Sequence, residues 1–295
     1  MHKRIFDFTR LQKDVLRNGT VDGPYLVGTG KEDSSDFGRI HLWQGEPSHY
    51  KKPWGSDECN AINGTDGTVF PPLINKETLL YTFIPELCRS VHLKYEKEVD
   101  LGGIPGFRFV LHPDSVSSAD VRPENKCFCV DECLGAGLLD VTNCYNGKQF
   151  IMSSPHFYVP EEAGDTGYNE SLISGLEPLK DLHETFFDIE PRTGSLLRAR
   201  KRLQTNVKVR PFEGYNTFKN IPKMEIPVFW VEEITDDQTM ERRLRPVVDV
   251  GDNFSMGARI GIACGVLALS FLISIACWCC KQRRRERRQA AVQRQ

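Results

Sequence analysis

Ile260 to Cys280 reads IGIACGVLALSFLISIACWCC, a run of 21 residues without a charge. As a helix that rises about 1.5 Å per residue, this run would extend roughly 31 Å, which matches the hydrocarbon core of a bilayer. An uncharged run of this length favours a membrane span over a buried core helix. Because backbone polar groups in lipid must bond to one another, we predict a transmembrane helix here.

The flanks of this run predict its orientation. Residues 281–295 hold seven basic side chains against one acid, Glu286, whereas Arg259 is the lone basic residue just before the run. Positive charge gathers on the cytoplasmic side of a span. We therefore expect a basic cytoplasmic tail at 281–295 and an ectodomain at 18–259, preceded by an atypical segment at 1–17.

The expected ectodomain is acidic. Of the 38 Lys and Arg residues, 8 lie at or beyond Arg259, whereas only 1 of the 40 Asp and Glu residues does. This leaves 30 basic side chains against 39 acidic ones in the ectodomain. Nucleic-acid-binding proteins carry the opposite bias, so we do not expect a nucleic-acid partner.

The ten cysteines fall into two groups, six in the ectodomain and four in or beside the span. An even set in an oxidising compartment predicts disulfides, although spacing alone leaves the pairing open. A zinc site formed by the last four ectodomain cysteines is the alternative, but C-x-C-x3-C does not match the common structural zinc spacings. The ectodomain cysteines are Cys59, Cys88, Cys127, Cys129, Cys133 and Cys144.

Four Asn-x-Ser/Thr sequons agree with a secretory compartment, and they begin at Asn18, Asn63, Asn169 and Asn253. The first 20 residues, however, contain no apolar stretch and are not a signal peptide. We therefore expect that the chain lacks its natural N-terminal portion, either as a fragment or as a short form.

Hydrophobic patterning predicts a β-rich α+β ectodomain with largely antiparallel strands. Apolar and polar residues alternate along most of the expected strands, and Gly102-Gly103 marks a turn between two of them. Helical signals are short, at Thr78–Cys88 and Thr239–Arg245. The expected strands are Gly38–Trp43, Ser90–Val99, Phe107–Leu111, Leu203–Val209 and a buried Ile226–Val231.

Several ordered motifs together resemble the class B scavenger receptor family. That family includes fatty acid translocase (platelet glycoprotein IV), the high-density-lipoprotein receptor and the type 2 lysosomal integral membrane protein. The resemblance covers roughly Asn18 to Cys280. The motifs are CNAINGTDGTVF at Cys59, CRSV at Cys88, GGIPGFRFVL at Gly102, CFC at Cys127, SSPHFYVP at Ser153, FFDIEPRTG at Phe186 and KRLQTNV at Lys201.

This resemblance implies an antiparallel β-barrel-like ectodomain core through which a lipid tunnel runs. Family members carry a span at each end, so the chain would correspond to the C-terminal half or more, without the first span and the helical apex. By analogy with fatty acid translocase, the cysteines would pair as Cys59–Cys127, Cys88–Cys144 and Cys129–Cys133, with Cys127–Cys129 as an alternative bridge. Each bridge would stabilise the domain by roughly 2–4 kcal/mol.

The resemblance also implies a non-enzymatic membrane receptor. It would bind lipids, fatty acids, lipoproteins or other anionic particles for uptake or transfer, with endocytosis of the cargo, and it would reside in the plasma membrane. A lysosomal membrane receptor that sorts a hydrolase is one alternative, and an inert or decoy short form is another. A second copy of the chain is a further candidate partner, and we expect no cofactor and no metal site.

Three groups of side chains have both a functional and a structural interpretation. Ser153 or Ser154 with His156 or His183 could form a hydrolase site, but no Gly-x-Ser-x-Gly elbow accompanies them, so structural histidines are favoured. The basic run 198–202 could bind anions, but a solvated strand edge is favoured. Phe186, Phe187, Phe229 and Trp230 could line a lipid cavity or simply pack in the core.

The cysteines at the cytoplasmic edge of the predicted span are Cys277, Cys279 and Cys280. Cysteines beside a membrane and a polybasic segment are candidates for palmitoylation. The neighbouring arginines would add attraction to anionic lipids of the inner leaflet.

Overall fold

The computed structural model describes residues 23–235, 244–246, 248–250 and 270. The chain divides into two compact units, Met1–Met240 and Glu241–Gln295. In the second unit the described residues are helical. The atypical segment 1–17, the basic tail and all of the predicted span except residue 270 lie outside the described residues. So do Asn18, Asn253, the three palmitoylation candidates and most of the helix expected at Thr239–Arg245. Within the described part of the chain, no helix is long and apolar enough to cross a membrane.

The first unit begins with a small two-stranded sheet, β1 (Tyr25–Val27) and β2 (Ile40–Trp43), which pair antiparallel. The strand predicted at Gly38–Trp43 is therefore confirmed over Ile40–Trp43, although the buried residues, Ile40 and Trp43, do not alternate regularly. Inward-facing Ile40 and Trp43 pack with Ile62 and Phe83, and burial of these apolar side chains stabilises this end of the unit.

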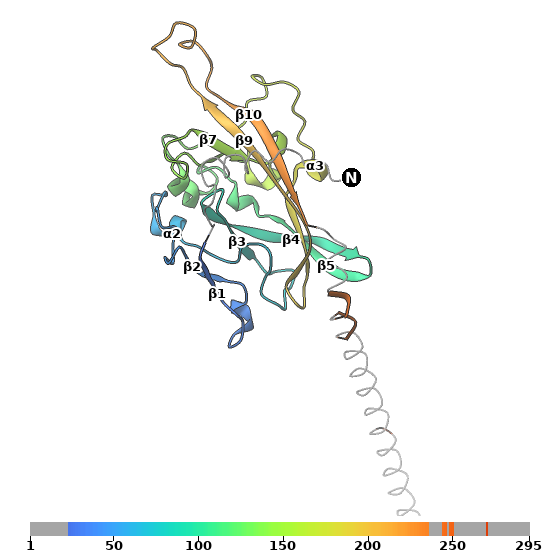
Figure 1. The fold of residues 1–295 in the computed structure, drawn as a ribbon. Coiled ribbons are helices and arrows are strands. Elements are labelled where there is room, and N and C mark those ends of the chain that lie inside the picture. The colour runs from blue at the N-terminus through green and yellow to red at the C-terminus, as the bar shows by residue number, and fades with distance from the viewer. Residues whose placement is uncertain (1–22, 236–243, 247, 251–269, 271–295) are drawn as a thin grey trace, which may run out of the picture. The chain divides into compact units, whose positions relative to one another are not determined.

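An eight-stranded antiparallel sheet forms the body of the unit (Figure 1). Strand order is β3-β4-β5-β8-β9-β7-β6, and β10 pairs with β9 outside this order. The strands are β3 (Leu80–Ile84), β4 (Arg89–Leu101), β5 (Ile104–Leu111), β6 (Leu139–Asp140), β7 (Phe150–Ser153), β8 (Phe186–Glu190), β9 (Ser195–Val209) and β10 (Met224–Ile234).

Short helices connect the strands, as expected for a β-rich α+β fold, and that prediction is confirmed. Between the described strands, the α-helices are α2 (Asp57–Asn60) and α3 (Lys180–His183). The 3₁₀ helices are η1 (Ser34–Asp36), η2 (Pro113–Ser115), η3 (Pro123–Phe128), η4 (Pro155–Phe157) and η5 (Glu161–Ala163). The predicted turn at Gly102-Gly103 is also confirmed, with φ of +61° and +87°, values that a two-residue turn between twisted strands requires.

Strand β9 branches the sheet. Arg200 lies opposite β8 on one edge of β9 and opposite β10 on the other. Val207 likewise lies opposite β7 on one edge and β10 on the other. Strands β8 and β7 therefore share one edge of β9, one after the other. Between the two, Thr185 Oγ1 accepts the Arg202 N–H at 2.9 Å and donates to the Arg202 carbonyl at 3.2 Å. Thr185 thereby satisfies the backbone of β9 at a position where neither β8 nor β7 pairs with it.

Three expectations are wrong. The sheet is not closed into a barrel, because β3 and β6 at its two ends do not pair with each other, as closure requires. The segment Thr78–Cys88 forms strand β3 and a turn instead of a helix, because pairing with β4 overrides the helical pattern. Strand β10 is not buried: it pairs with one neighbour, and Ile226, Val228 and Trp230 are exposed.

The basic run 198–202 lies inside the sheet rather than on a solvated edge, which corrects the favoured interpretation. Strand β9 has partners on both edges. The basic side chains of the run form ion pairs with acids on neighbouring strands, namely Arg198 with Asp188, Arg200 and Arg202 with Glu232, and Lys201 with Glu233.

The Asp188 carboxylate joins three neighbouring strands. Arg108 on β5 and Arg198 on β9 lie opposite Asp188 in register, and Asp188 is fully buried. Arg108 Nε donates to Oδ1 at 2.7 Å, and Arg198 Nε donates to Oδ2 at 2.8 Å. The ring of Phe186 lies 3.7 Å below the Arg108 guanidinium. The carboxylate thus satisfies two partly buried cations at once, and this arrangement fixes β8 between β5 and β9.

Replacing Asp188 with Asn should lower the free energy of unfolding by about 3–5 kcal/mol, because two guanidinium groups would lose their counter-charge inside the protein. Urea unfolding of the full chain, followed by tryptophan fluorescence, measures this loss. Glu98→Gln is the matched control, since Glu98 pairs with Lys76 at the surface and should change little. Equal stability of Asp188→Asn and the wild type would contradict this role.

His49 should make the fold acid-sensitive. Its ring is buried against Trp43 at 5.0 Å, and burial together with the Lys51 charge lowers its pKa from 6.5 to about 4. Between these two pH values the unfolded chain binds a proton at His49 and the folded chain does not, so stability falls as the pH falls through this window. The expected loss is about 1–3 kcal/mol between pH 7 and pH 4.

Urea unfolding at pH 7, 6, 5 and 4 tests this dependence. The variant His49→Phe keeps an aromatic ring in the same apolar cluster but cannot bind the proton. Its unfolding free energy should decline less steeply than that of the wild type. Parallel declines would show that other groups cause the acid sensitivity.

Candidate functional site

The branch at β9 encloses an apolar cavity of about 70 Å³. Its wall includes side chains of β3, β4 and β9, together with residues of the segments that precede and follow β7. The lining is chiefly apolar and includes Val91, Leu93, Leu111, Val116, Leu139 and Leu203. Because water gains little from contact with such walls, the cavity favours an apolar occupant.

A wider groove of about 960 Å³ adjoins this cavity. The two hollows share Leu111, Tyr158, Pro160 and Glu184 as wall residues. The groove differs in character, since charged side chains line it, namely Lys94, Glu96, Glu161, Glu162, Asp165 and Lys180. An apolar interior therefore opens beside a charged mouth, an arrangement that suits an amphipathic molecule.

Tyr158 and Glu184 form the polar part of the wall between the hollows. The Tyr158 hydroxyl donates to Glu184 Oε1 at 3.1 Å. Burial raises the pKa of Glu184 above its usual range, against the opposing effect of Lys180. Burial and the Glu184 charge also raise the pKa of Tyr158. Acidification therefore neutralises this wall at a higher pH than it would neutralise an exposed carboxylate.

The lysines at the mouth already have acidic partners. Lys180 Nζ lies within ion-pair distance of Glu96 and 3.8 Å from Glu184, and Lys94 Nζ lies 3.1 Å from Glu162. Glu162 is exposed, whereas Glu96 and Glu184 are mostly buried, with side-chain exposures of 17% and 10%. A ligand anion can therefore compete most readily for Lys94, whose partner Glu162 is 65% exposed.

The structure gives the hydrolase interpretation no support among the described residues. Ser153 Oγ donates to the Ser154 carbonyl and accepts from the side-chain amides of Gln204 and Asn206. The rings of His156 and His183 stack at 4.2 Å, and the Nδ1 atom of each accepts a backbone N–H. In the described structure neither histidine is hydrogen-bonded to a serine hydroxyl.

The aromatic group proposed as a cavity lining is divided. Only Phe187 of the four lines the cavity. Phe186 lies instead beneath the guanidinium groups of Arg108 and Arg198, and Trp230 is partly exposed. The leucines and valines of the wall were not singled out from the sequence, because alternating apolar residues do not distinguish a cavity wall from a packed core.

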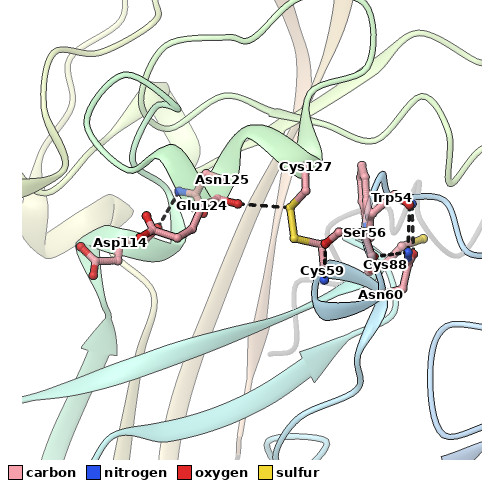
Figure 2. The surroundings of a disulfide bond; sticks show 9 residues. All are labelled: Trp54, Ser56, Cys59, Asn60, Cys88, Asp114, Glu124, Asn125 and Cys127. Carbon is pink, nitrogen blue, oxygen red and sulfur yellow. Dashed lines mark hydrogen bonds between the residues drawn. A yellow bond between two sulfur atoms is a disulfide. The ribbon is translucent and has the colours of Figure 1, made fainter.

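Three disulfides form among the described residues. Cys59 in α2 is joined to Cys127 in η3, with Cα atoms 6.4 Å apart (Figure 2). Cys88 is joined to Cys144 at 6.1 Å, and Cys129 to Cys133 at 4.8 Å. The structure thus brings together the pairs that the family resemblance implied, not the alternative Cys127–Cys129 bridge.

The Cys88–Cys144 bridge is part of a buried cluster. Trp54, Leu87, Val91, Val141 and Met152 are the other buried members. Trp54 Nε1 donates to the Cys88 carbonyl at 2.7 Å. Since Leu87 and Val91 of this cluster also line the cavity, the bridge anchors one of its walls.

Two of the sequons lie in the described residues. Asn63 and Asn169 are both exposed. The Asn63 backbone N–H donates to Ser90 Oγ at 2.8 Å. The exposure of both side chains is compatible with a glycan at each position.

The comparisons with known proteins agree on one family. The model of the CD36 family matches residues 6–278. Lysosome membrane protein 2 of Mus musculus is 38% identical over 236 residues, which cover 79% of this chain and 47% of that protein. Sensory neuron membrane protein 2 of Heliothis virescens is 32% identical over 238 residues, covering 77% of this chain and 44% of that protein. Protein peste of Drosophila melanogaster is 30% identical over 229 residues, covering 77% and 40%. The chain spans about half the length of the curated relatives it matches.

The exposed sequons predict N-glycans on the chain expressed in mammalian cells. Treatment with an N-glycosidase should increase the gel mobility of the wild type, and Asn63→Gln and Asn169→Gln should each remove one step of that shift. Asn216→Gln is the control, because Asn216 is exposed but lies outside any sequon. A mobility unaffected by the enzyme would contradict the luminal placement of the ectodomain.

Proposed function

Because the chain belongs to the CD36 family, we propose that the cavity beside β9 receives the hydrocarbon chain of a lipid whose polar head lies in the adjoining groove. The observation that carries this proposal is the shared wall: an apolar hollow and a charged one meet at Leu111 and Tyr158. Burial of a hydrocarbon chain contributes about 0.8 kcal/mol per methylene, so even a short length of chain in the cavity supplies useful affinity.

The head group would be acidic. Lys94 and Lys180 lie at the mouth. Glu162, the partner of Lys94, is exposed, so a ligand carboxylate or phosphate can replace it on that lysine, and Lys180 also presents a partly exposed ammonium group. A fatty acid satisfies both requirements with one molecule. The chemistry is binding and release, without a covalent step, in keeping with a family of receptors.

The wider proposal is a membrane receptor that takes up lipids or lipid-bearing particles. It is anchored by residues 260–280, and its juxtamembrane cysteines Cys277, Cys279 and Cys280 are candidates for palmitoylation. The uncharged run and the basic residues that follow it support the anchor. The names of the relatives, which describe membrane proteins, support the same placement.

A lysosomal location is the second candidate. It is favoured by the similarity to lysosome membrane protein 2. In that case the chain would act as a sorting receptor for a hydrolase, and the cavity would not be needed for transport. Lipid uptake that depends on the cavity therefore separates the two functions.

Leu111→Trp tests the cavity. Leu111 lies between the two hollows, so an indole at this position should obstruct the passage from the groove. Binding of a fluorescent fatty acid to the purified chain should weaken by at least about tenfold, because the hydrocarbon chain would lose its apolar site. Cells that express the variant should also take up less of the fluorescent lipid.

Leu182→Trp is the matched control, because Leu182 is exposed and lines neither hollow. It should bind the probe as the wild type does. Unchanged binding by Leu111→Trp, with both variants folded by circular dichroism, would contradict the proposed lipid site. If the wild-type chain binds the probe in vitro but cells that express it take up no lipid, the result would favour the sorting receptor.

A further inference from the structure

Two histidines and an aspartate gather where β4 and the end of β5 meet η2. His92 is on β4, His112 follows β5, and Asp114 is in η2. One donor atom from each lies within 4.8 Å of the others, and the imidazole rings are 4.5 Å apart. The backbone holds the two histidines together, because the His112 N–H donates to the His92 carbonyl at 2.9 Å.

The Nδ1 atoms of both rings face η2. His112 Nδ1 accepts the Asp114 backbone N–H at 3.2 Å and lies 3.8 Å from Asp114 Oδ2. His92 Nδ1 lies 3.1 Å from Ser115 Oγ. A neutral imidazole that accepts at Nδ1 carries its proton on Nε2, so His112 presents a lone pair beside the carboxylate. This is the protonation state in which an imidazole ligates a metal ion.

The turn that carries Asp114 is held in place from behind. Asn125 Nδ2 donates to the carbonyls of Asp114 and Ser117, both at 2.8 Å. Asn125 belongs to η3, which the Cys59–Cys127 disulfide ties to α2 (Figure 2). Arg122 Nη2 holds Asp114 Oδ2 at 3.0 Å. Outer contacts of this kind orient ligands at metal sites in proteins.

We propose that His92, His112 and Asp114 bind a divalent transition-metal ion, with Zn²⁺ as the ion best matched to two imidazoles and one carboxylate. Three protein ligands leave a fourth position for water. In a tetrahedral zinc site the donor atoms stand roughly 3.3 Å apart, so the half-buried side chains must close by a small rotation. The ion would replace the Asp114 N–H as the partner of His112 Nδ1.

The Arg122 guanidinium opposes a cation at this position, so the carboxylate must be shared. His112 Nδ1 and Arg122 Nη2 both face Oδ2, so the carboxylate would turn until Arg122 keeps one oxygen and the metal takes the other. Ligating carboxylates at metal sites are commonly hydrogen-bonded in this way. The bound ion would link β4, the end of β5 and η2. Its effect would therefore be structural, raising the stability of this side of the sheet by mass action.

Calorimetric titration of ZnCl₂ into the purified full chain tests the site. The chain carries a tag without histidines, its disulfides are kept oxidised and its free thiols are alkylated, so that cysteine and tag binding do not contribute. One Zn²⁺ per chain is expected for the wild type. His92→Gln and His112→Gln should each weaken binding by about tenfold or more.

His41→Gln is the matched control. His41 also pairs with an aspartate, Asp36, at 2.9 Å, but no second histidine belongs to that pair. It should bind Zn²⁺ within about twofold of the wild type. Zn²⁺ should also raise the thermal unfolding midpoint of the wild type and His41→Gln, but not that of His92→Gln.

Asp114→Asn provides a second disruption if either histidine variant fails to fold, and it too should weaken binding. Wild-type chain that binds no Zn²⁺ at about 1 mM would overturn the proposal. Binding with equal affinity in the wild type, His92→Gln and His112→Gln would overturn it as well.

Discussion

The rest of the first unit depends on one edge of β9, which pairs with both β8 and β7. One edge of a strand can serve two neighbours only in succession, and between them Thr185 bonds to Arg202 in place of a strand. Residues of both neighbours, Ser153 of β7 and Phe187 of β8, contribute to the wall of the apolar cavity. Asp188 keeps the β8 side of this branch in register through Arg108 and Arg198. The strand pairing of β9 therefore positions part of the cavity wall.

Much of the fold can be predicted from local pattern. The alternation in β4 and β5 and the turn at Gly102-Gly103 are local features, and the structure contains them as expected. The incorrect predictions have a common cause, because each concerned a segment whose conformation or burial is set by the strands beside it. The residues of Thr78–Cys88 became a strand because β4 pairs with them. The apolar residues of β10 are exposed because β9 is the only strand beside β10 in the described sheet.

The candidate sites were even harder to predict from local sequence pattern than the fold. The basic run 198–202 suggested a solvated edge, since a sequence does not display the acids that face it across β8 and β10. The cavity wall draws on strands far apart in sequence, and its leucines look like ordinary core residues. His92 and His112 are 20 positions apart and match no metal-binding spacing, so only the pairing of β4 with β5 places their rings together. The cysteine pairs, in contrast, came from a family resemblance that the comparisons now support across residues 6–278.

Photo-crosslinking directly tests whether a hydrocarbon chain binds in the cavity beside β9. A fatty acid with a diazirine near the middle of its hydrocarbon chain is bound to the purified full chain, irradiated, and located by mass spectrometry of the peptides. If the lipid binds there, labelling is expected at residues that line the cavity, such as Leu111, Tyr158 and Leu203, and unlabelled oleate should abolish it by competition. Labelling confined to residues outside the cavity and the groove, or labelling that oleate does not reduce, would contradict it.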